Sequence, residues 1–363
     1  HLLYCGSSCS PERDPLAPFL QGSGASQLNA FTSPDKTAVL FQTAVAPAWD
    51  VLLRLHLDAA FRALLREESF LSEGACWKPG PKGPVLTGVL YNEMREAMAS
   101  ADGIVEQLVF ERLFAGSPYR YQSGGDPDTL HTVTIEDIRR FHAAHYRPSH
   151  ACIYLYGDVP LETFSVLDEY LGAGPAEARH APPAPVERWD APQRAVVERS
   201  DIGPGEGACA LAWLLGEPAT LEEEAVLEML EHVLVYGEGA VLESVLRADS
   251  RSKGLAYGQL FTERREWVFL VNVDEVTERD ASGVERLVIG ELERLVRDGV
   301  PRSLVRGAAR SIELEGREML LGPRRGLDLF DAVLDRWMFA NDPLAELDRV
   351  ETVRALAERI EGG

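Results

Sequence analysis

A proline-rich segment at residues 173–193 divides this chain, and no other feature constrains its fold as strongly. The segment carries five prolines and few large apolar residues, which argues for a semi-rigid linker between domains. A length of 363 residues also suits two to three ordinary domains. We therefore predict a first domain over 1–172, a linker over 173–193 and a second domain over 194–363.

Short apolar strands and amphipathic helices alternate irregularly on both sides of this linker. In the first domain, we expect strands within 26–43 and over 151–156, helices over 47–71, 88–100, 102–115, 134–145 and 160–171, and a loop over 74–87. In the second domain, we expect strands over 194–199, 208–215, 255–261 and 267–274, and helices from Thr220 and near 281–298, 301–318 and 325–339. Without strict strand–helix alternation, this order indicates an α+β fold with helices packed on mixed or antiparallel sheets.

A weak internal echo suggests that the two domains have similar folds. Ala30-Phe31-Thr32, a turn and a second apolar strand in the first domain parallel Leu260-Phe261-Thr262, a turn and a second strand in the second. Helical stretches flank both pairs. This echo supports a duplication without establishing it.

Charge and cysteine content exclude several classes of protein. The formal net charge of −22 argues against a nucleic-acid partner. No apolar run reaches the 18 or so residues of a membrane span, so we expect no membrane partner. Five cysteines without a framework spacing indicate free thiols in a reducing compartment. With no targeting segment in these residues, we expect a cytoplasmic protein, and an organellar parent stays open.

Taken one by one, the chemically active residues are weak candidates. The chain has no HExxH, HxxEH or paired CxxC motif. His142, His145 and His150 gather near the end of a helix, where histidines more often meet terminal carbonyls or solvent. His232 lies within an apolar helix and is expected to be structural. The glycine-rich stretches lack the GK[ST] of a phosphate-binding loop.

The order of five segments carries more information than any single residue. These segments are HLLYCGS at 1–7, LNAFTSPDKT at 28–37, GVLYNEMREAM at 88–98, SPYRYQSGGDPDTL at 117–130 and FHAAHYRPSHACIYLYGD at 141–158. In order and spacing they resemble the presequence-protease branch of the pitrilysin/insulinase metallopeptidases. A looser resemblance continues to the end of the chain. It implies a chain that is half of a clamshell peptidase, built from two consecutive α/β-layered domains.

The resemblance also implies a zinc site. The family carries an inverted HxxEH motif on a helix, whose two histidines bind zinc and whose glutamate is the catalytic base, with a distant glutamate as third ligand. HLLYCGS places His1 on the second histidine, and the YNEM segment makes Glu93 the distant ligand. The first histidine and the catalytic glutamate would precede His1. We therefore expect no catalytic residue within this chain, which would begin inside a helix of a longer protein.

The family's peptide substrate lies along an edge strand, which the resemblance places at Leu28, Asn29, Ala30, Phe31 and Thr32. Another interpretation is an ordinary hairpin strand with Phe31 in the core. The partners implied are extended peptides and the C-terminal half of the same enzyme. We expect a zinc metalloendopeptidase half, acting on unstructured peptides and inactive by itself. A non-catalytic scaffold or subunit of the same superfamily is the alternative, and an unrelated acidic binding protein is a third possibility.

Overall fold

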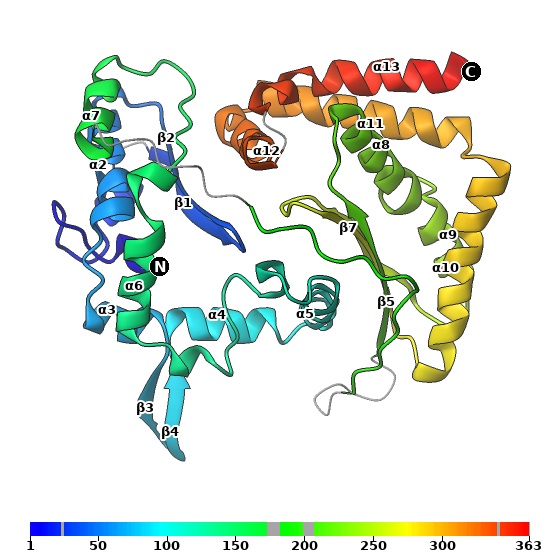
Figure 1. The fold of residues 1–363 in the computed structure, drawn as a ribbon, viewed down its shortest axis with the longest axis horizontal. Helices are drawn as coiled ribbons and strands as arrows, with labels where there is room; N and C mark the ends of the chain where they lie inside the picture. The colour runs from blue at the N-terminus through cyan, green and yellow to red at the C-terminus, as the bar shows by residue number, and fades with distance from the viewer. Residues whose placement is uncertain (23–24, 173–181, 199–206, 340–341, 363) are drawn as a thin grey trace. The chain divides into compact units, whose positions relative to one another are not determined.

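The computed structural model describes residues 1–22, 25–172, 182–198, 207–339 and 342–362 (Figure 1). Contacts divide the chain into two compact units. Unit 1 comprises residues 1–100 and 121–181, and unit 2 comprises residues 101–120 and 182–363. The α+β class is confirmed, because each unit combines helices with antiparallel strands. The predicted domains remain predictions, and residues 101–120 pack with the second unit.

Unit 1 consists of two β-hairpins and a set of helices. The strands are β1 (Ala25–Ser33), β2 (Lys36–Thr43), β3 (Cys76–Gly80) and β4 (Gly83–Thr87). The α-helices are α1 (Ala17–Gly22), α2 (Ala46–Arg62), α3 (Glu67–Glu73), α4 (Val89–Ala97), α6 (Ile135–His145) and α7 (Glu162–Leu171). Single 3-10 turns lie at η1 (Leu2–Tyr4), η3 (Leu130–Thr132) and η4 (Pro148–His150). The long helix α2 organises the unit, since its buried leucines Leu52, Leu53 and Leu57 contact side chains of β2 and α7.

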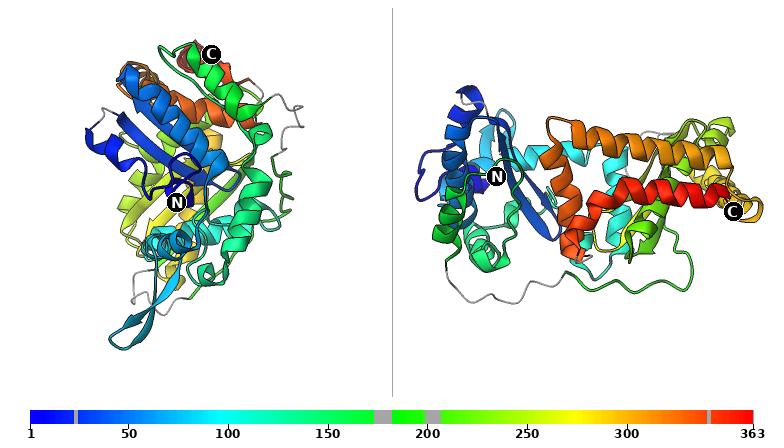
Figure 2. Two further views of the ribbon diagram at one scale, coloured as in Figure 1. Left: turned by 90° about the vertical axis from the view of Figure 1, so that its left-hand side faces the viewer. Right: turned by 90° about the horizontal axis from the view of Figure 1, so that it is seen from above.

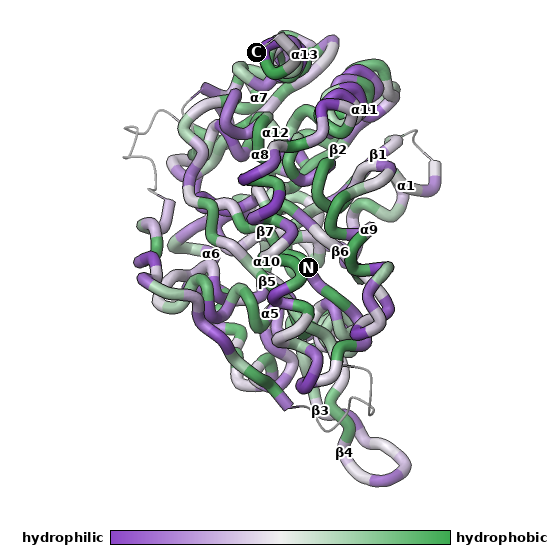
Figure 3. The backbone as a smooth tube through the Cα atoms, turned by 90° about the vertical axis from the view of Figure 1, so that its right-hand side faces the viewer, coloured by the Kyte–Doolittle hydropathy of each residue, from purple (hydrophilic) through white to green (hydrophobic). Residues whose placement is uncertain are grey.

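Unit 2 is built on a three-stranded antiparallel sheet of order β5–β7–β6, comprising β5 (Ala208–Gly216), β6 (Gly254–Phe261) and β7 (Trp267–Asp274). The central strand β7 is apolar along nearly its whole length (Figure 3). It is also buried over all but its last residue, as expected for a strand covered on both faces. Phe269 and Val271 belong to the large core under the helices, whereas Val268 and Leu270 pack with Phe110 and Phe114. Helix α5 (Ala101–Leu113) therefore covers the second face of this sheet.

The remaining elements of unit 2 are helical. They are η2 (Pro118–Arg120), α8 (Leu221–Glu231), the π-helical turn η5 (His232–Tyr236), α9 (Val241–Ala248), α10 (Glu278–Asp298), α11 (Arg302–Leu321), α12 (Arg325–Phe339), η6 (Pro343–Asp348) and α13 (Arg349–Gly362). Helices α11 and α13 run side by side (Figure 2). Over the described residues, no helix combines the length and the apolar character that a membrane crossing requires.

The structure corrects several sequence-based predictions. The loop expected over 74–87 is the hairpin β3–β4, whose glycine- and proline-rich composition concealed its strands. The strands expected over 151–156 and 194–199 do not form in the described residues there, 151–156 and 194–198. An apolar run becomes a strand only if a neighbouring strand pairs with it. Helix α13 was not predicted. Helices α1 and α9 lie where a helical stretch is expected before each hairpin, although no bounds were predicted for them.

The predicted linker lies partly outside the described residues, since 173–181 is not described. Residues 182–198 form neither helix nor strand, yet they belong to unit 2 and pack within it. The Val186 N–H donates to Glu266 Oε2 at 2.8 Å, and the Val186 side chain packs on the α5 side of the sheet. The described part of the predicted linker therefore packs within unit 2.

Candidate functional site

The structure brings His1 and Glu93 together. His1 Nε2 lies 3.3 Å from Glu93 Oε2, and both side chains are partly open to solvent. The two residues are far apart in the sequence and come from different elements. This approach was expected only from the resemblance.

The segment after His1 is fixed on the end of α2. The Leu64 N–H donates to Gly6 O at 3.0 Å, and the Ser8 N–H donates to Arg62 O at 3.1 Å. Gly6 has φ of +108°, a conformation that side-chain-bearing residues rarely adopt, so a glycine is required where the chain turns away from η1. These backbone bonds hold His1 in place although its side chain is exposed.

Glu93 is placed by the base of the β3–β4 hairpin. Gly74 precedes the hairpin and Gly88 follows it, and the two backbones touch so closely that a Cβ on Gly88 would lie 1.8 Å from Gly74 O. Tyr91 N–H also donates to Gly74 O at 3.4 Å. The end of α3 and the start of α4 therefore meet at this point (Figure 1).

A third charged residue, Glu73, joins the pair and was missed by the sequence analysis. Its Oε2 lies 3.4 Å from His1 Nδ1, and its Oε1 accepts a 2.7 Å hydrogen bond from Arg13. Burial raises the pKa of the nearby Cys5 thiol, and the Glu73 charge adds to this effect. The only signal in the sequence was a glutamate next to a glycine ahead of a glycine- and proline-rich stretch.

The donor set suits zinc in kind and in spacing. Imidazole nitrogen and carboxylate oxygen are ordinary zinc ligands, and two ligand atoms at tetrahedral zinc lie about 3.4 Å apart. The His1–Glu93 separation of 3.3 Å matches this spacing and exceeds that of a strong charge-assisted hydrogen bond. Within the described ranges, however, no group of three or more His, Cys, Asp or Glu side chains is arranged to hold a metal ion.

The weaker histidine candidates have other partners. His142 Nε2 lies 2.8 Å from Ala60 O, and burial lowers the pKa of the imidazole. His150 Nε2 lies 3.0 Å from Arg147 Nη2. His232 is largely buried, as expected of a structural histidine. The His142 contact with a main-chain carbonyl is of the kind expected for a histidine near a helix end.

The segment Leu28–Thr32 lies in strand β1, and its register decides which backbone groups face outward. A two-residue turn closes the hairpin at the pair Ser33–Lys36, so Phe31 and Asn29 form the hydrogen-bonded pairs with β2. The N–H and C=O groups of Leu28, Ala30 and Thr32 consequently face the other edge. The outward Ala30 N–H donates to Asn29 Oδ1 at 2.8 Å. No further strand pairs with β1 among the described residues.

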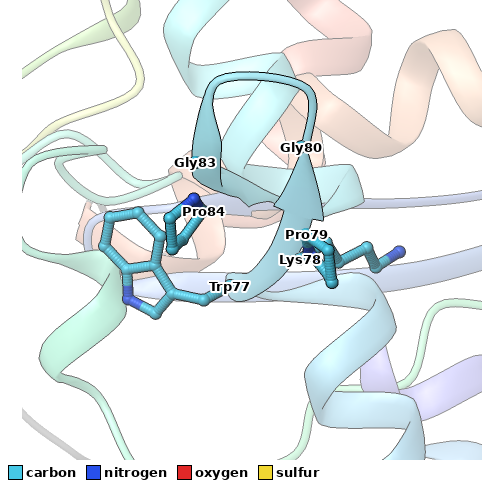
Figure 4. A pocket seen from close by; sticks show the side chains of 6 residues that line it. All are labelled: Trp77, Lys78, Pro79, Gly80, Gly83 and Pro84. Carbon is cyan, nitrogen blue, oxygen red and sulfur yellow. The ribbon is translucent and has the colours of Figure 1, made fainter.

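The β3–β4 hairpin differs from β1 because prolines remove the N–H donors from its outward edges. Its closing pair is Gly80–Gly83, so Pro79 and Pro84 occupy outward-facing positions of their strands, where they remove the N–H donors. Trp77 is 63% exposed, and a hollow of about 410 Å³ lies against it. In Figure 4, Trp77 and Pro84 lie on one side of the hairpin and Lys78 projects from the other. Prolines protect this hairpin from strand pairing, whereas β1 has none in its outward positions.

Comparisons with known proteins agree with the resemblance. Residues 132–312 match a family model described as the Peptidase M16 inactive domain. The chain is 28% identical over 379 residues to presequence protease 1, chloroplastic/mitochondrial, of Arabidopsis thaliana, covering 99% of this chain and 34% of that protein. It is 29% identical to the mitochondrial presequence protease of Yarrowia lipolytica, covering 96% of this chain and 36% of that protein. The chain thus spans about a third of the length of these curated relatives.

Solved structures share the fold. A protease from Helicobacter pylori superposes with a TM-score of 0.75 at 19% identity, covering 100% of this chain and 84% of that chain. Pitrilysin superposes with a TM-score of 0.61 at 15% identity, covering 99% of this chain and 38% of that chain. At these identities the match supports the fold alone.

Proposed function

Because this chain belongs to the presequence-protease branch of the pitrilysin/insulinase (M16) peptidase family, we propose that it is part of a zinc-dependent endopeptidase that degrades unstructured peptides. His1 and Glu93 would be two of the zinc ligands. The first histidine and the catalytic glutamate would come from the segment before His1.

The approach of His1 and Glu93 carries this proposal. Their 3.3 Å separation suits two ligands of one tetrahedral ion. In the complete enzyme, zinc would supply a Lewis acid for the scissile carbonyl. This chain's own contribution is to hold one imidazole and one carboxylate with their donor atoms converging.

Peptide binding would use the outward edge of β1. The backbone groups of Leu28, Ala30 and Thr32 can pair with the main chain of any extended peptide, as in other strand-addition complexes. Main-chain pairing discriminates little between sequences, which suits an enzyme for unstructured peptides. Folded proteins would be excluded because they present few free, extended segments.

The remainder of the enzyme is the partner that we propose for this chain. The relatives are about three times longer, since the chain covers 34% and 36% of two of them. A second half would close the clamshell around the peptide. It would also supply the groups that stabilise the tetrahedral intermediate. A non-catalytic scaffold is the second candidate, and residues 132–312, which match a domain described as inactive, would suit either role because they lie outside the candidate site. The residues before His1 discriminate the two, because a catalytic member requires His-x-x-Glu there.

Zinc content of the full-length protein tests the proposal. Glu93→Gln should lower zinc affinity at least about tenfold and abolish peptide cleavage, because a neutral amide is a poor zinc ligand. Glu96→Gln changes the same charge on the same exposed helix and should leave both unchanged. Stoichiometric zinc and full activity in Glu93→Gln would overturn the ligand assignment. The 363-residue chain without the preceding segment should bind zinc poorly.

A further inference from the structure

We infer that Glu73 is a positioning residue that orients the His1 imidazole for metal binding. This inference rests on the proposed function, because it takes His1 as a ligand. It adds a residue outside the expected motif, located at the end of α3. Its basis is the arrangement of two carboxylates around the one imidazole ring of His1.

The two ring nitrogens of His1 face two different carboxylates. Nε2 faces Glu93 Oε2 at 3.3 Å, and Nδ1 faces Glu73 Oε2 at 3.4 Å. A histidine that binds a metal through one nitrogen usually donates the other N–H to a carboxylate or carbonyl, which fixes its tautomer. If Nε2 binds the metal, Nδ1 must carry the proton, and Glu73 is placed to accept it.

The Glu73 side chain is more buried and more firmly hydrogen-bonded than an ordinary surface carboxylate. Its side chain is 14% exposed, whereas that of Glu93 is 54% exposed. Arg13 Nη2 donates to its other oxygen at 2.7 Å, so one oxygen is engaged and the second remains directed at His1. The carboxylate is thereby oriented before any metal arrives.

The hairpin β3–β4 couples the two carboxylates. Glu73 immediately precedes the Gly74–Gly88 contact and Glu93 follows it within two turns of α4. Closing the hairpin brings the end of α3 against the start of α4, so one backbone contact sets the positions of both groups. This accounts for a glycine at 88, where any side chain would separate the two helices.

A competing explanation is that Glu73 only anchors the segment 1–16 through Arg13. The two roles differ in their response to the loss of Arg13. If anchoring is the whole role, Arg13→Ala should impair the site as much as loss of Glu73. If Glu73 acts on the ring, Arg13→Ala should impair the site less than the loss of Glu73, because the carboxylate that faces His1 remains.

Zinc affinity of the full-length protein, measured by competition with a chelator, tests the inference. Glu73→Ala should weaken zinc binding about 10–100-fold, the usual effect of removing such a partner. Glu73→Gln keeps an oxygen acceptor and should lose less. Glu68→Gln, on the same helix with a 77% exposed side chain, should remain near the unchanged protein. Arg13→Ala keeps the carboxylate but removes one of its hydrogen bonds, so it should lose clearly less zinc affinity than Glu73→Ala. In ¹⁵N spectra of the metal-free protein, the His1 ring should shift from the Nδ1–H tautomer towards a mixture in Glu73→Ala.

The outcomes separate this inference from the proposed function. Glu93-dependent zinc binding that Glu73→Ala leaves unchanged would overturn the positioning role alone. The same holds if Arg13→Ala reproduces the full loss, or if the His1 tautomer does not respond to Glu73. If the unchanged protein shows no zinc binding that depends on Glu93, the proposed function fails and the inference falls with it.

Discussion

Both units place a histidine beside a glutamate from a separate helix, and a glycine follows five residues after each histidine. In unit 1, His1 Nε2 lies 3.3 Å from Glu93, and in unit 2, His232 Nε2 lies 3.9 Å from Glu315. The helical sequences also correspond, since Glu93-Met-Arg-Glu in α4 parallels Glu315-Gly-Arg-Glu in α11. The internal echo predicted from the two hairpins thus extends to the candidate site.

The surroundings of the two histidines differ. Unit 2 reads Glu228-Met-Leu-Glu231-His232, an inverted HxxEH pattern whose first histidine is replaced by Glu228. Arg349 binds the Glu228 carboxylate and also contacts Glu346 and Glu224. A guanidinium therefore supplies the positive charge that these carboxylates need. A histidine–glutamate pair alone does not make a metal site. Whether a cation can bind there depends on whether the surrounding carboxylates are already neutralised, as Arg349 neutralises them in unit 2.

Replacing Arg349 should have the largest effect. Arg349→Ala would leave Glu224, Glu228 and Glu346 with less compensation, although Arg336 still binds Glu224. Breaking a buried ion network by removing one partner costs about 3–5 kcal/mol, because the remaining charges stay desolvated. Burial already raises the pKa of Glu228, and Arg349 opposes that shift. Urea denaturation measures the effect.

Arg247→Ala is the matched control, since Arg247 pairs with Glu243 at the surface and its side chain is 75% exposed. It should cost less than about 1 kcal/mol. A loss below 1 kcal/mol for Arg349→Ala would contradict the idea that this guanidinium neutralises the carboxylates of unit 2.

Glu231 occupies the position of the catalytic base within the pattern of unit 2, but it has a different role. Its Oε1 accepts the Leu260 N–H at 2.7 Å, on the edge of β6. Burial raises its pKa from 4.5 to about 7, with Glu228 and Glu315 adding to the shift. Between these values the native state binds more protons than the unfolded state, so the free energy of unfolding should fall as pH rises through this window.

The expected decrease is roughly 1–3 kcal/mol, and it should level off above about pH 7. Glu231→Gln keeps an acceptor for the Leu260 N–H and should remove this pH dependence, whereas Glu238→Gln at an exposed position should preserve it. Thermal unfolding at several pH values from 4 to 8 measures the slope. An identical slope in Glu231→Gln would show that another group titrates.

Local signals were predictable from the sequence, and non-local ones were not. The predicted helices over 134–145 and from Thr220 are confirmed, and each begins at a threonine cap that acts through contacts within one turn: Thr134 with Asp137, and Thr220 with the Glu223 N–H. Packing of α5 on the second unit's sheet depends on Phe110 and Phe114 meeting Leu270, which no local pattern encodes. Glu73 was missed for the same reason, because only the closure of a hairpin with loop-like composition brings it to His1.

The strand edges provide a second comparison between the units. Leu260 N–H in unit 2 is held by a carboxylate from α8, whereas Ala30 N–H in unit 1 is held only by the neighbouring Asn29 side chain. The corresponding edge in unit 1 is therefore easier to open. This difference agrees with the proposed use of β1 as a peptide-binding edge.

Proline at position 30 should separate peptide binding from stability. The Ala30 N–H faces away from β2, so Ala30→Pro removes no bond between β1 and β2 and loses only the local bond to Asn29 Oδ1. It should therefore cost less than about 1 kcal/mol. Peptide KM should rise several-fold because one main-chain donor is lost, while zinc content stays constant. Phe31→Pro, at a hydrogen-bonded pair, should destabilise the protein by more than this. An unchanged KM in folded, zinc-loaded Ala30→Pro would mean that substrate does not use this edge.

The smallest effect should come from Asn29→Ala, which tests whether the Asn29 amide merely covers the edge. The bond from Ala30 N–H to Asn29 Oδ1 connects adjacent residues on an exposed surface, so its loss should change the free energy of unfolding by less than about 0.5 kcal/mol. A peptide would then no longer have to displace the amide. Peptide KM should fall slightly, by no more than about threefold. An increase of tenfold would instead show that the Asn29 side chain contacts the peptide, and the edge would then select sequence as well as conformation.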